Sequence, residues 1–321
     1  TDRYEEVSWN EAFAAIGATL NALPKNSAVF YASGHAGLEA SYLYALLARV
    51  HGTNNLPQSS NMCHETTSVG LTKVIGSPVG TIVWEDLAET DAFFVFGQNP
   101  GTNSPRFLHP MKELKDRGGK IVTFNPVIEQ GLVSFVDPQS PAAMLTGKET
   151  KISDQYHQVK AGGDIAAILG LCKCVVQADD AARAAGTAEV IDHAFVEQHT
   201  TGFDSFIQSC RDADWAEIER ESGLSEAALR EAAEVYIAAE KVIGVYGMGL
   251  TQHAHGALNI AMLVNLLLLR GNIGRPGAGC CPVRGHSNVQ GQRTVGIAEK
   301  AHLVPLDKLK ELFGFDPPTE D

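Results

Sequence analysis

Residues 61–68, NMCHETTS, place a thiol and an imidazole side by side in a stretch with few large apolar residues. Cys63 and His64 have polar neighbours, whereas a structural cysteine is usually surrounded by core residues. The pair could act as nucleophile and base, or the thiolate could bind a metal while the imidazole moves a proton. An incidental thiol in a polar loop is the third interpretation. The secondary-structure elements that position Cys63 and His64 distinguish between these three interpretations.

Apolar runs alternate with amphipathic stretches along the chain. Runs that predict buried strands occupy 27–34, 91–97, 120–126 and 241–247, and helical spacing occupies 38–50, 105–118, 225–240 and 257–271. Strands that are continuous Val, Ile and Phe runs, separated by helices, indicate parallel sheets covered on both faces. The sequence therefore predicts an α/β fold.

In parallel sheets ligands bind where strands end and helices begin, because backbone N–H groups and helix N-termini favour anions there. Glycine and small polar residues follow the predicted strands in ASGHAG (32–37), GQNPGTNSPR (97–106), FNP (124–126) and YGMGLTQHAHG (246–256). Turn chemistry alone would explain any one of these segments. None has the spacing of a Walker-type phosphate loop or of a GxGxxG fingerprint. Four such segments together indicate an extended ligand-binding edge.

Composition excludes some classes of protein. The net charge of −13 argues against general nucleic-acid binding, which depends on clustered Lys and Arg. The longest apolar run, 260–269, is too short to cross a bilayer, which needs roughly 20 residues. Six cysteines without a CxxC pair fit a reducing cytoplasm and argue against a zinc or iron-sulfur site made by this chain alone.

Six segments in order carry a resemblance to a known family. They are NMCHETTSVGL, DAFFVFGQNPGTNSPR, KIVTFNPV, QVKAGGD, YGMGLTQHAHG and LRGNIGRPGAGCCPVRGHSNVQG. Together they resemble the alpha subunit of molybdopterin oxidoreductases of the formate dehydrogenase H type, and within it an acid-resistance-associated subgroup for which GQNPGTNSPR looks typical. The resemblance implies Rossmann-like nucleotide-binding domains of the formate dehydrogenase and dimethyl sulfoxide reductase type.

The resemblance also implies a cofactor and a substrate. The cofactor is a molybdenum or tungsten ion held by two molybdopterin guanine dinucleotides, with Cys63 as the protein ligand to the metal and His64 beside it. Arg284 matches the family's active-site arginine, whose guanidinium can hold a small carboxylate such as formate. The family commonly has glutamine where this chain has His286, and that departure puts the substrate in question.

The remaining motifs match segments that bind the dinucleotides. By resemblance, the carboxylate of Asp164 accepts hydrogen bonds from guanine. For Asn99, Asn125 and Gln252, turn or strand capping is the structural alternative, and for Asp164 it is a helix N-cap. The cofactor-binding residues implied are Gly97, Asn99, Asn103, Asn125, Gly163, Asp164, Met248, Gly249, Gln252, His286 and Asn288.

The domain organisation follows from the same resemblance. Residues 59–286 are expected to form a molybdopterin guanine dinucleotide-binding α/β domain, and 1–58 with 287–321 to form part of a second α/β domain. We expect the sequence to be an inactive fragment, with any iron-sulfur cluster outside it and electrons leaving through a partner. Two alternatives stay open: an acyl-transfer enzyme that uses Cys63 and His64, and a non-catalytic nucleotide-binding or assembly module.

Overall fold

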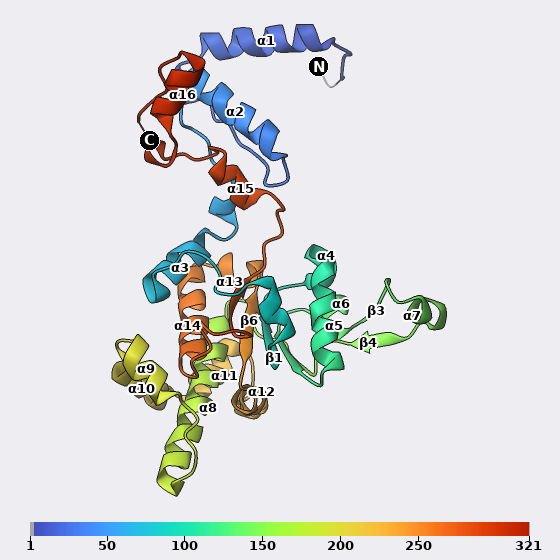
Figure 1. Ribbon diagram of the computed structural model, residues 1–321, viewed down its shortest axis with the longest axis vertical. Helices are drawn as coiled ribbons and strands as arrows, with labels where there is room; N and C mark the ends of the chain where they lie inside the picture. Colours follow the sequence, from blue (N-terminus) through green and yellow to red (C-terminus); the bar gives the residue numbers. More distant parts are fainter. Residues whose placement is uncertain (1–2, 321) are drawn as a thin grey trace. The chain divides into compact units, whose positions relative to one another are not determined.

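The computed structural model describes residues 3–320, which divide into two packing units (Figure 1). The larger unit runs from Cys63 to Gly285. The smaller unit combines the chain up to Met62 with the chain from His286 onward. The assignment of 59–286 to dinucleotide binding stays a prediction.

The larger unit is built on a five-stranded sheet in the order β5-β2-β1-β6-β7. Every neighbouring pair in it is parallel. The strands are β1 Ala92–Phe96, β2 Lys120–Phe124, β5 Gln155–His157, β6 Val242–Tyr246 and β7 Gly279–Pro282. The α/β class with a parallel sheet is therefore confirmed.

Helices cover both faces of this sheet, which is why its central strands are apolar throughout (Figure 1). Alternate residues of β1 face opposite sides, so Phe94 and Phe96 join one core and Phe93 and Val95 the other. The first core is closed by α3 Glu65–Ile75, α8 Asp164–Ala185, α12 Glu226–Ala238 and α14 Gly256–Leu268. The second is closed by α5 Leu108–Asp116.

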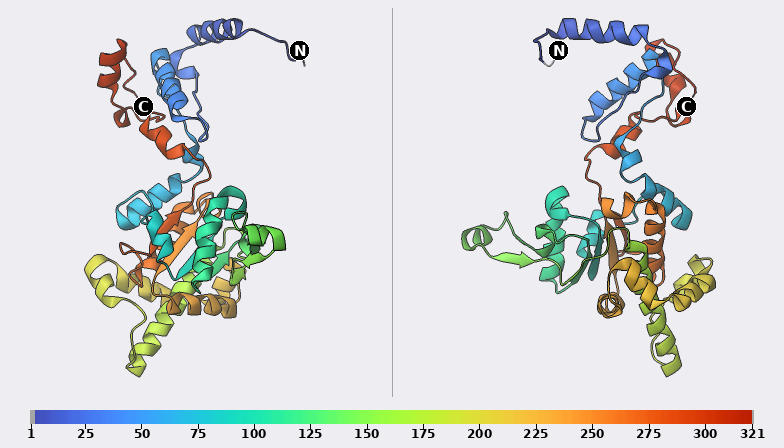
Figure 2. Two further views of the ribbon diagram at one scale, coloured as in Figure 1. Left: turned by 45° about the vertical axis from the view of Figure 1, so that its right-hand side comes forward. Right: turned by 180° about the vertical axis from the view of Figure 1, so that it is seen from behind.

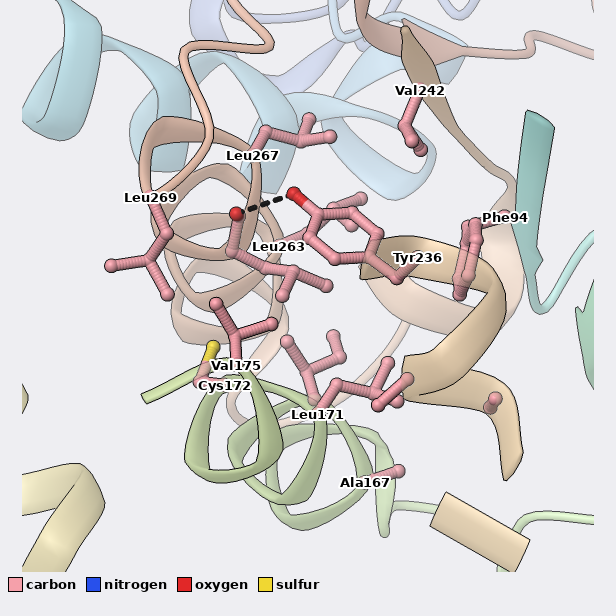
Figure 3. Packing of buried hydrophobic residues seen from close by; sticks show 14 of the residues in the cluster. Phe94, Ala167, Leu171, Cys172, Val175, Tyr236, Val242, Leu263, Leu267 and Leu269 are labelled. Atoms are coloured by element: carbon pink, nitrogen blue, oxygen red, sulfur yellow. Dashed lines mark hydrogen bonds between the residues drawn. The ribbon is translucent and has the colours of Figure 1, made fainter. Parts of the chain in front are cut away.

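The apolar cluster of the first core contains a buried hydrogen bond between two of its helices (Figure 3). The fully buried Tyr236 of α12 donates from its hydroxyl to the Leu266 carbonyl of α14, at 2.6 Å. Its ring meets Phe94 of β1 edge to face, with centroids 5.3 Å apart. Leu171 and Val175 of α8 join the same cluster. The bond satisfies the hydroxyl and ties α12 to α14 at the same point.

Shorter elements complete the larger unit. A two-stranded antiparallel hairpin with a short helix between its strands projects from the sheet domain (Figure 2). In this hairpin the strands are β3 Ser134–Val136 and β4 Glu149–Lys151, and the helix is α7 Pro141–Thr146. The other short elements of the larger unit are η3 Trp84–Ala88, α4 Pro100–Asn103, η4 Pro105–Phe107, α6 Gln130–Val133, α9 His193–His199, α10 Phe203–Asp212, α11 Trp215–Ser222 and α13 Met248–Thr251.

The smaller unit packs a few helices around a small core of its own. Phe30, Ala48, Leu56 and Ile297 are among the buried residues that form this core. Its elements are α1 Trp9–Ala22, η1 Lys25–Ser27, α2 Leu38–His51, η2 Ser59–Met62, α15 Val289–Thr294, η5 Ala301–Leu303 and α16 Leu306–Phe313.

The predicted strand at 27–34 is wrong. This segment makes only an isolated bridge, between Ala32 and Gln58. Ala28, Phe30 and Ala32 are buried while Val29 and Tyr31 are exposed, so the segment alternates like a strand. It has no ladder of hydrogen bonds in the described chain, however, and an apolar alternation without a partner strand does not make a sheet.

No helix within residues 3–320 combines the length and the apolar character that a membrane span requires.

Candidate functional site

The parallel sheet brings the predicted site segments to one edge. The last residues of β1, β2 and β6, which are Phe96, Phe124 and Tyr246, are aligned in register. Pro282 at the end of β7 is aligned with Tyr246. Gly97, Asn125, Met248 and Arg284 therefore all follow the carboxyl ends of neighbouring strands, where α/β sheets bind ligands.

Cys63 lies directly before α3 and is 5% exposed. Its thiol donates to the sulfur of Met248, with 3.2 Å between the two sulfur atoms. Burial raises the pKa of Cys63, while the positive charge of Arg284 and the backbone N–H of His64 act in the opposite direction. Cys63, Met248 and Arg284 thus meet at this edge, and the two sulfur atoms form a pair of soft donors.

His64 is fully buried, and both of its ring nitrogens are engaged. Nε2 lies 3.2 Å from the carbonyl oxygen of Val283, which can only accept, so Nε2 carries the hydrogen. Nδ1 then accepts from the Thr67 hydroxyl at 2.9 Å, and Thr67 in turn accepts from Tyr246 at 3.2 Å. Burial and the nearby Arg284 lower the pKa of His64 to about 4. The imidazole is therefore neutral and held in one tautomer at neutral pH.

This arrangement does not support the acyl-transfer alternative. A nucleophile and its base need a hydrogen bond between thiol and imidazole. The thiol of Cys63 bonds to Met248, and the nitrogens of His64 bond to Thr67 and Val283.

Thr67 and Tyr246 are site residues that the sequence did not reveal. Thr67 lies one helical turn after His64, so its spacing could have suggested the contact. Tyr246 is 179 positions from Thr67 and could not have been found from spacing.

Gly97 and Gly249 bring two strand-end turns into backbone contact. The Gly249 amide donates to the Gly97 carbonyl at 2.9 Å. A Cβ added to Gly97 would lie 2.6 Å from the Gly249 Cα, and one added to Gly249 would lie 2.4 Å from the Gly97 Cα. Gly97 also has a φ of +52°, which favours glycine. Both glycines are therefore required by the geometry.

The predicted amide residues make local bonds. Asn99 is the N-cap of α4 and accepts from the Thr102 amide at 3.2 Å. Asn103 is the exposed last residue of α4. Asn125 is buried and donates to the Val127 carbonyl at 2.6 Å. Gln252 follows α13, and its backbone N–H donates to the Met248 carbonyl. The structure confirms that Asn99 caps α4. Nucleotide binding by these four residues remains a prediction.

Gly163 and Asp164 start α8, and Gly163 rather than Asp164 is the N-cap. A Cβ on Gly163 would lie 2.5 Å from the Glu221 carbonyl oxygen. Asp164 is 5% exposed, and burial raises its pKa to about 6, partly offset by His253 and by its own backbone N–H. A buried carboxylate of this kind is costly unless donors pair with it.

His286 and Asn288 belong to the smaller unit and contact the turn at 34–36 there. The His286 ring lies 4.7 Å from that of His35, measured between centroids. Asn288 donates from its side chain to the Ala36 carbonyl at 3.0 Å and from its amide to the Gly34 carbonyl at 2.9 Å. All the other predicted site residues lie in the larger unit.

Comparison with known proteins identifies the family. A model of the molybdopterin oxidoreductase family matches residues 1–313. Protein YdeP of Escherichia coli K12 is 49% identical over 99% of this chain, which covers 42% of that protein. A Mycobacterium bovis protein named as an oxidoreductase is 42% identical over 99% of the chain and 40% of its own length.

One more distant relative and one solved structure extend the comparison. The alpha subunit of an F420-dependent formate dehydrogenase of Methanococcus maripaludis is 28% identical over 91% of the chain and 39% of its own length. The solved structure of acetylene hydratase from Pelobacter acetylenicus superposes with a TM-score of 0.62 at 15% identity, over 87% of this chain and 34% of that one, and shows the shared fold. The chain thus spans about 40% of the length of these three curated relatives.

The matching family implies a molybdenum or tungsten pterin cofactor, and the residues at the carboxyl edge fit such a group. The sulfur of Cys63 is a soft donor, and Arg284 supplies a positive charge beside it. The Gly97–Gly249 contact leaves backbone without side chains at the same edge. On the match over nearly its whole length, the chain belongs to the molybdopterin oxidoreductase family.

Proposed function

We propose that the intact protein is a molybdenum or tungsten oxidoreductase with two molybdopterin guanine dinucleotides, and that it oxidises a small carboxylate such as formate by two electrons. The observation that carries this proposal is the position of Cys63. It lies directly before α3, at the carboxyl edge of the sheet, beside Met248 and within the field of Arg284.

The proposed role of Cys63 is to ligate the metal. A thiolate suits a sulfur-rich metal centre, which would hold it deprotonated. When bound, the metal–pterin group supplies a two-electron acceptor. Before metal binding, the hydrogen bond from the Cys63 thiol to Met248 orients the sulfur, which lies in a side chain that is 5% exposed. A metal-bound thiolate has no hydrogen to donate, so Met248 would then only contact it.

The proposed role of Arg284 is to position the substrate. A planar guanidinium binds a carboxylate through two parallel hydrogen bonds, which fixes both its distance and its plane. The positive charge of Arg284 already acts on Cys63 and His64, so it lies within electrostatic range of both. A carboxylate held by Arg284 would therefore be near the sulfur of Cys63.

The proposed role of His64 is to assist proton movement. Its Nε2 hydrogen is donated to the Val283 carbonyl, and its Nδ1 accepts from Thr67. The ring must release one of these bonds to exchange a proton with the substrate. Thr67 and Tyr246 would then restore the same tautomer after each turnover.

The guanine dinucleotide form is supported by Asp164 and the glycine contact. Guanine N1–H and N2–H offer two adjacent donors, which would pair with the buried carboxylate of Asp164. Gly97 and Gly249 would let the backbone approach a pyrophosphate.

The narrower assignments rest on the motifs and on distant relatives. The formate dehydrogenase type is supported by the 28% identical Methanococcus subunit. The acid-resistance-associated subgroup rests on GQNPGTNSPR. We also propose a cytoplasmic location and an electron-accepting partner outside residues 1–321.

The test uses the full-length protein with formate and an artificial electron acceptor. Arg284→Lys is expected to raise the KM for formate about tenfold or more, since lysine cannot form the paired bonds. Arg220→Lys, on the exposed surface of α11, is the matched control and should leave KM unchanged. An unchanged KM in Arg284→Lys would reject the carboxylate role, and absence of metal and pterin from the full-length protein would favour a non-catalytic module.

A further inference from the structure

Arg49 of α2 is a buried cation in the smaller unit, whereas Cys63, His64 and Arg284 belong to the larger unit. Its side chain is 1% exposed. In the part of the chain that the structure describes, no carboxylate forms an ion pair with it. Burial lowers the pKa of Arg49, and no acidic group among residues 3–320 counteracts that effect. A buried charge without an opposite charge is costly and uncommon.

Backbone carbonyls satisfy only part of the guanidinium. Nη1 donates to the carbonyls of Ala45 and Gly296, at 3.4 and 2.8 Å, and Nη2 donates to that of Ala298 at 3.1 Å. Nε is buried and has no acceptor among the described residues. A guanidinium has five N–H donors, so Nε–H and one Nη2 hydrogen are left over.

The two unpaired hydrogens of Arg49 are on Nε and Nη2. In another arginine of this chain, the same two nitrogens bind a carboxylate. Arg211 donates from Nε and Nη2 to the two oxygens of Asp180, at 3.0 and 2.6 Å. In Arg49 the same two nitrogens, which are buried, keep hydrogens that no described residue accepts.

A cavity of about 100 Å³ adjoins Arg49. Most of its other lining is apolar, including Leu46, Val295, Val304, Pro305 and Leu309. A dry cavity of roughly 150 Å³ is known to hold benzene, so this one has room for a short hydrocarbon chain. All of its lining residues belong to the smaller unit.

We propose that this cavity is a binding site for a short aliphatic monocarboxylate, whose carboxylate pairs with Arg49 and whose chain fills the apolar lining. The carboxylate supplies the missing negative charge and accepts from Nε and Nη2. The apolar chain replaces empty space beside Leu46 and Val304. Neither the proposed oxidation at Cys63 nor the resemblance assigns a ligand here.

Ligand-detected NMR on the 321-residue chain tests this proposal, with sodium butyrate as probe at constant ionic strength. Butyrate is expected to bind about tenfold or more tightly than n-butanol, since only the anion forms charged hydrogen bonds to Arg49. n-Butylamine should not bind. Equal affinity for butyrate and n-butanol would overturn the role of Arg49. Tighter binding of octanoate than of butyrate would overturn the short-chain assignment.

Two variants separate the charge from the cavity. Arg49→Lys keeps the charge but loses the paired donors, and it should weaken butyrate about tenfold or more. Val304→Phe fills the cavity while leaving Arg49 and its carbonyl bonds in place, and it should abolish binding. Val29→Phe, at an exposed position of the same unit, should leave binding unchanged. If Arg49→Lys fails to fold, Val304→Phe decides, and unchanged butyrate affinity in that variant rejects the site.

Discussion

The sulfur atoms of Cys63 and Met248 lie 3.2 Å apart although the residues are 185 positions apart in the chain. Met248 follows β6 and Cys63 precedes α3, so the contact joins two separate segments at the carboxyl edge. It leaves the Cys63 side chain 5% exposed. The thioether therefore both orients and covers the proposed metal ligand.

Truncating Met248 should uncover Cys63. We expect Met248→Ala to raise the rate of Cys63 alkylation by iodoacetamide several-fold and to cost about 2 kcal/mol of stability. Met248→Leu, which conserves volume, should leave the rate near that of the parent chain and cost less than about 1.5 kcal/mol. Mass spectrometry of the peptide that carries Cys63 measures the rate. Equal rates in Met248→Ala and the parent chain would show that Met248 does not cover the thiol.

The contact between Gly97 and Gly249 predicts a large penalty for a single methyl group. Gly249→Ala should destabilise the larger unit by roughly 1 to 3 kcal/mol, because the added Cβ meets the Gly97 backbone. Gly97→Ala should cost more, since its positive φ adds backbone strain of about 1 kcal/mol. Urea denaturation followed by circular dichroism provides the free energies of unfolding.

Gly147 is the matched control for this strain. It has a φ of +66°, and a Cβ built on it meets nothing within 4 Å. Gly147→Ala should therefore lower the free energy of unfolding by the cost of backbone strain alone, about 1 kcal/mol. If Gly97→Ala costs no more than Gly147→Ala, the two turns can separate, and the close approach is not needed for the fold.

Thr67 should be necessary for the hydrogen-bonded chain that ends at His64. Thr67→Val keeps the shape but leaves the buried His64 Nδ1 without its partner, at roughly 1 to 3 kcal/mol. It also removes the Thr67 acceptor of the Tyr246 hydroxyl, which keeps its interaction with Cys280. Thr67→Ser keeps the hydroxyl and should recover most of that stability. Thermal unfolding of both variants measures the difference. Equal stability of the valine and serine variants would mean that the hydroxyl contributes nothing.

Asp164 should make the stability of the larger unit depend on pH. Its folded pKa of about 6 lies above the ordinary value of 3.8, so the folded state holds this proton more tightly than the unfolded state. The contribution is present below pH 3.8 and is lost as the pH rises through about 6. The total change is roughly 2 to 3 kcal/mol.

Asp164→Asn removes this titration and keeps the shape of the side chain. We expect the free energy of unfolding of the parent chain to fall relative to that of Asp164→Asn as the pH rises from 4 to 7, in urea titrations at several pH values. Parallel curves for the two proteins would show that the carboxyl is not desolvated as the structure indicates.

The sequence predicts those parts of the fold that local pattern determines. β1 and β6 are continuous apolar runs, β2 is mostly apolar, and each lies where the pattern predicted a strand. β5 (QYH) and β7 (GCCP) have no such pattern and are strands only because they pair with β2 and β6. The segment at 27–34 has the pattern but no partner strand. Partner strands, which are distant in sequence, decide these cases.

In the candidate site, too, local motifs predict some features, and contacts between distant segments determine the others. The motif NMCHETTS identified Cys63 and His64, but the bonds of His64 to Thr67 and Val283 come from folding. The motif predicts a proton-handling role for His64, whereas packing engages both of its ring nitrogens. Asp164 could be recognised as a helix-start residue, while its burial depends on the helices around it.

X-ray absorption at the molybdenum or tungsten edge tests most directly whether Cys63 ligates the metal. The full-length, cofactor-loaded protein should show one more sulfur neighbour of the metal than its Cys63→Ser variant, and the variant should lose metal-dependent oxidation. Met62→Leu, the exposed preceding residue, is the matched control and should match the parent protein. Identical sulfur counts and unchanged activity in Cys63→Ser would contradict the account.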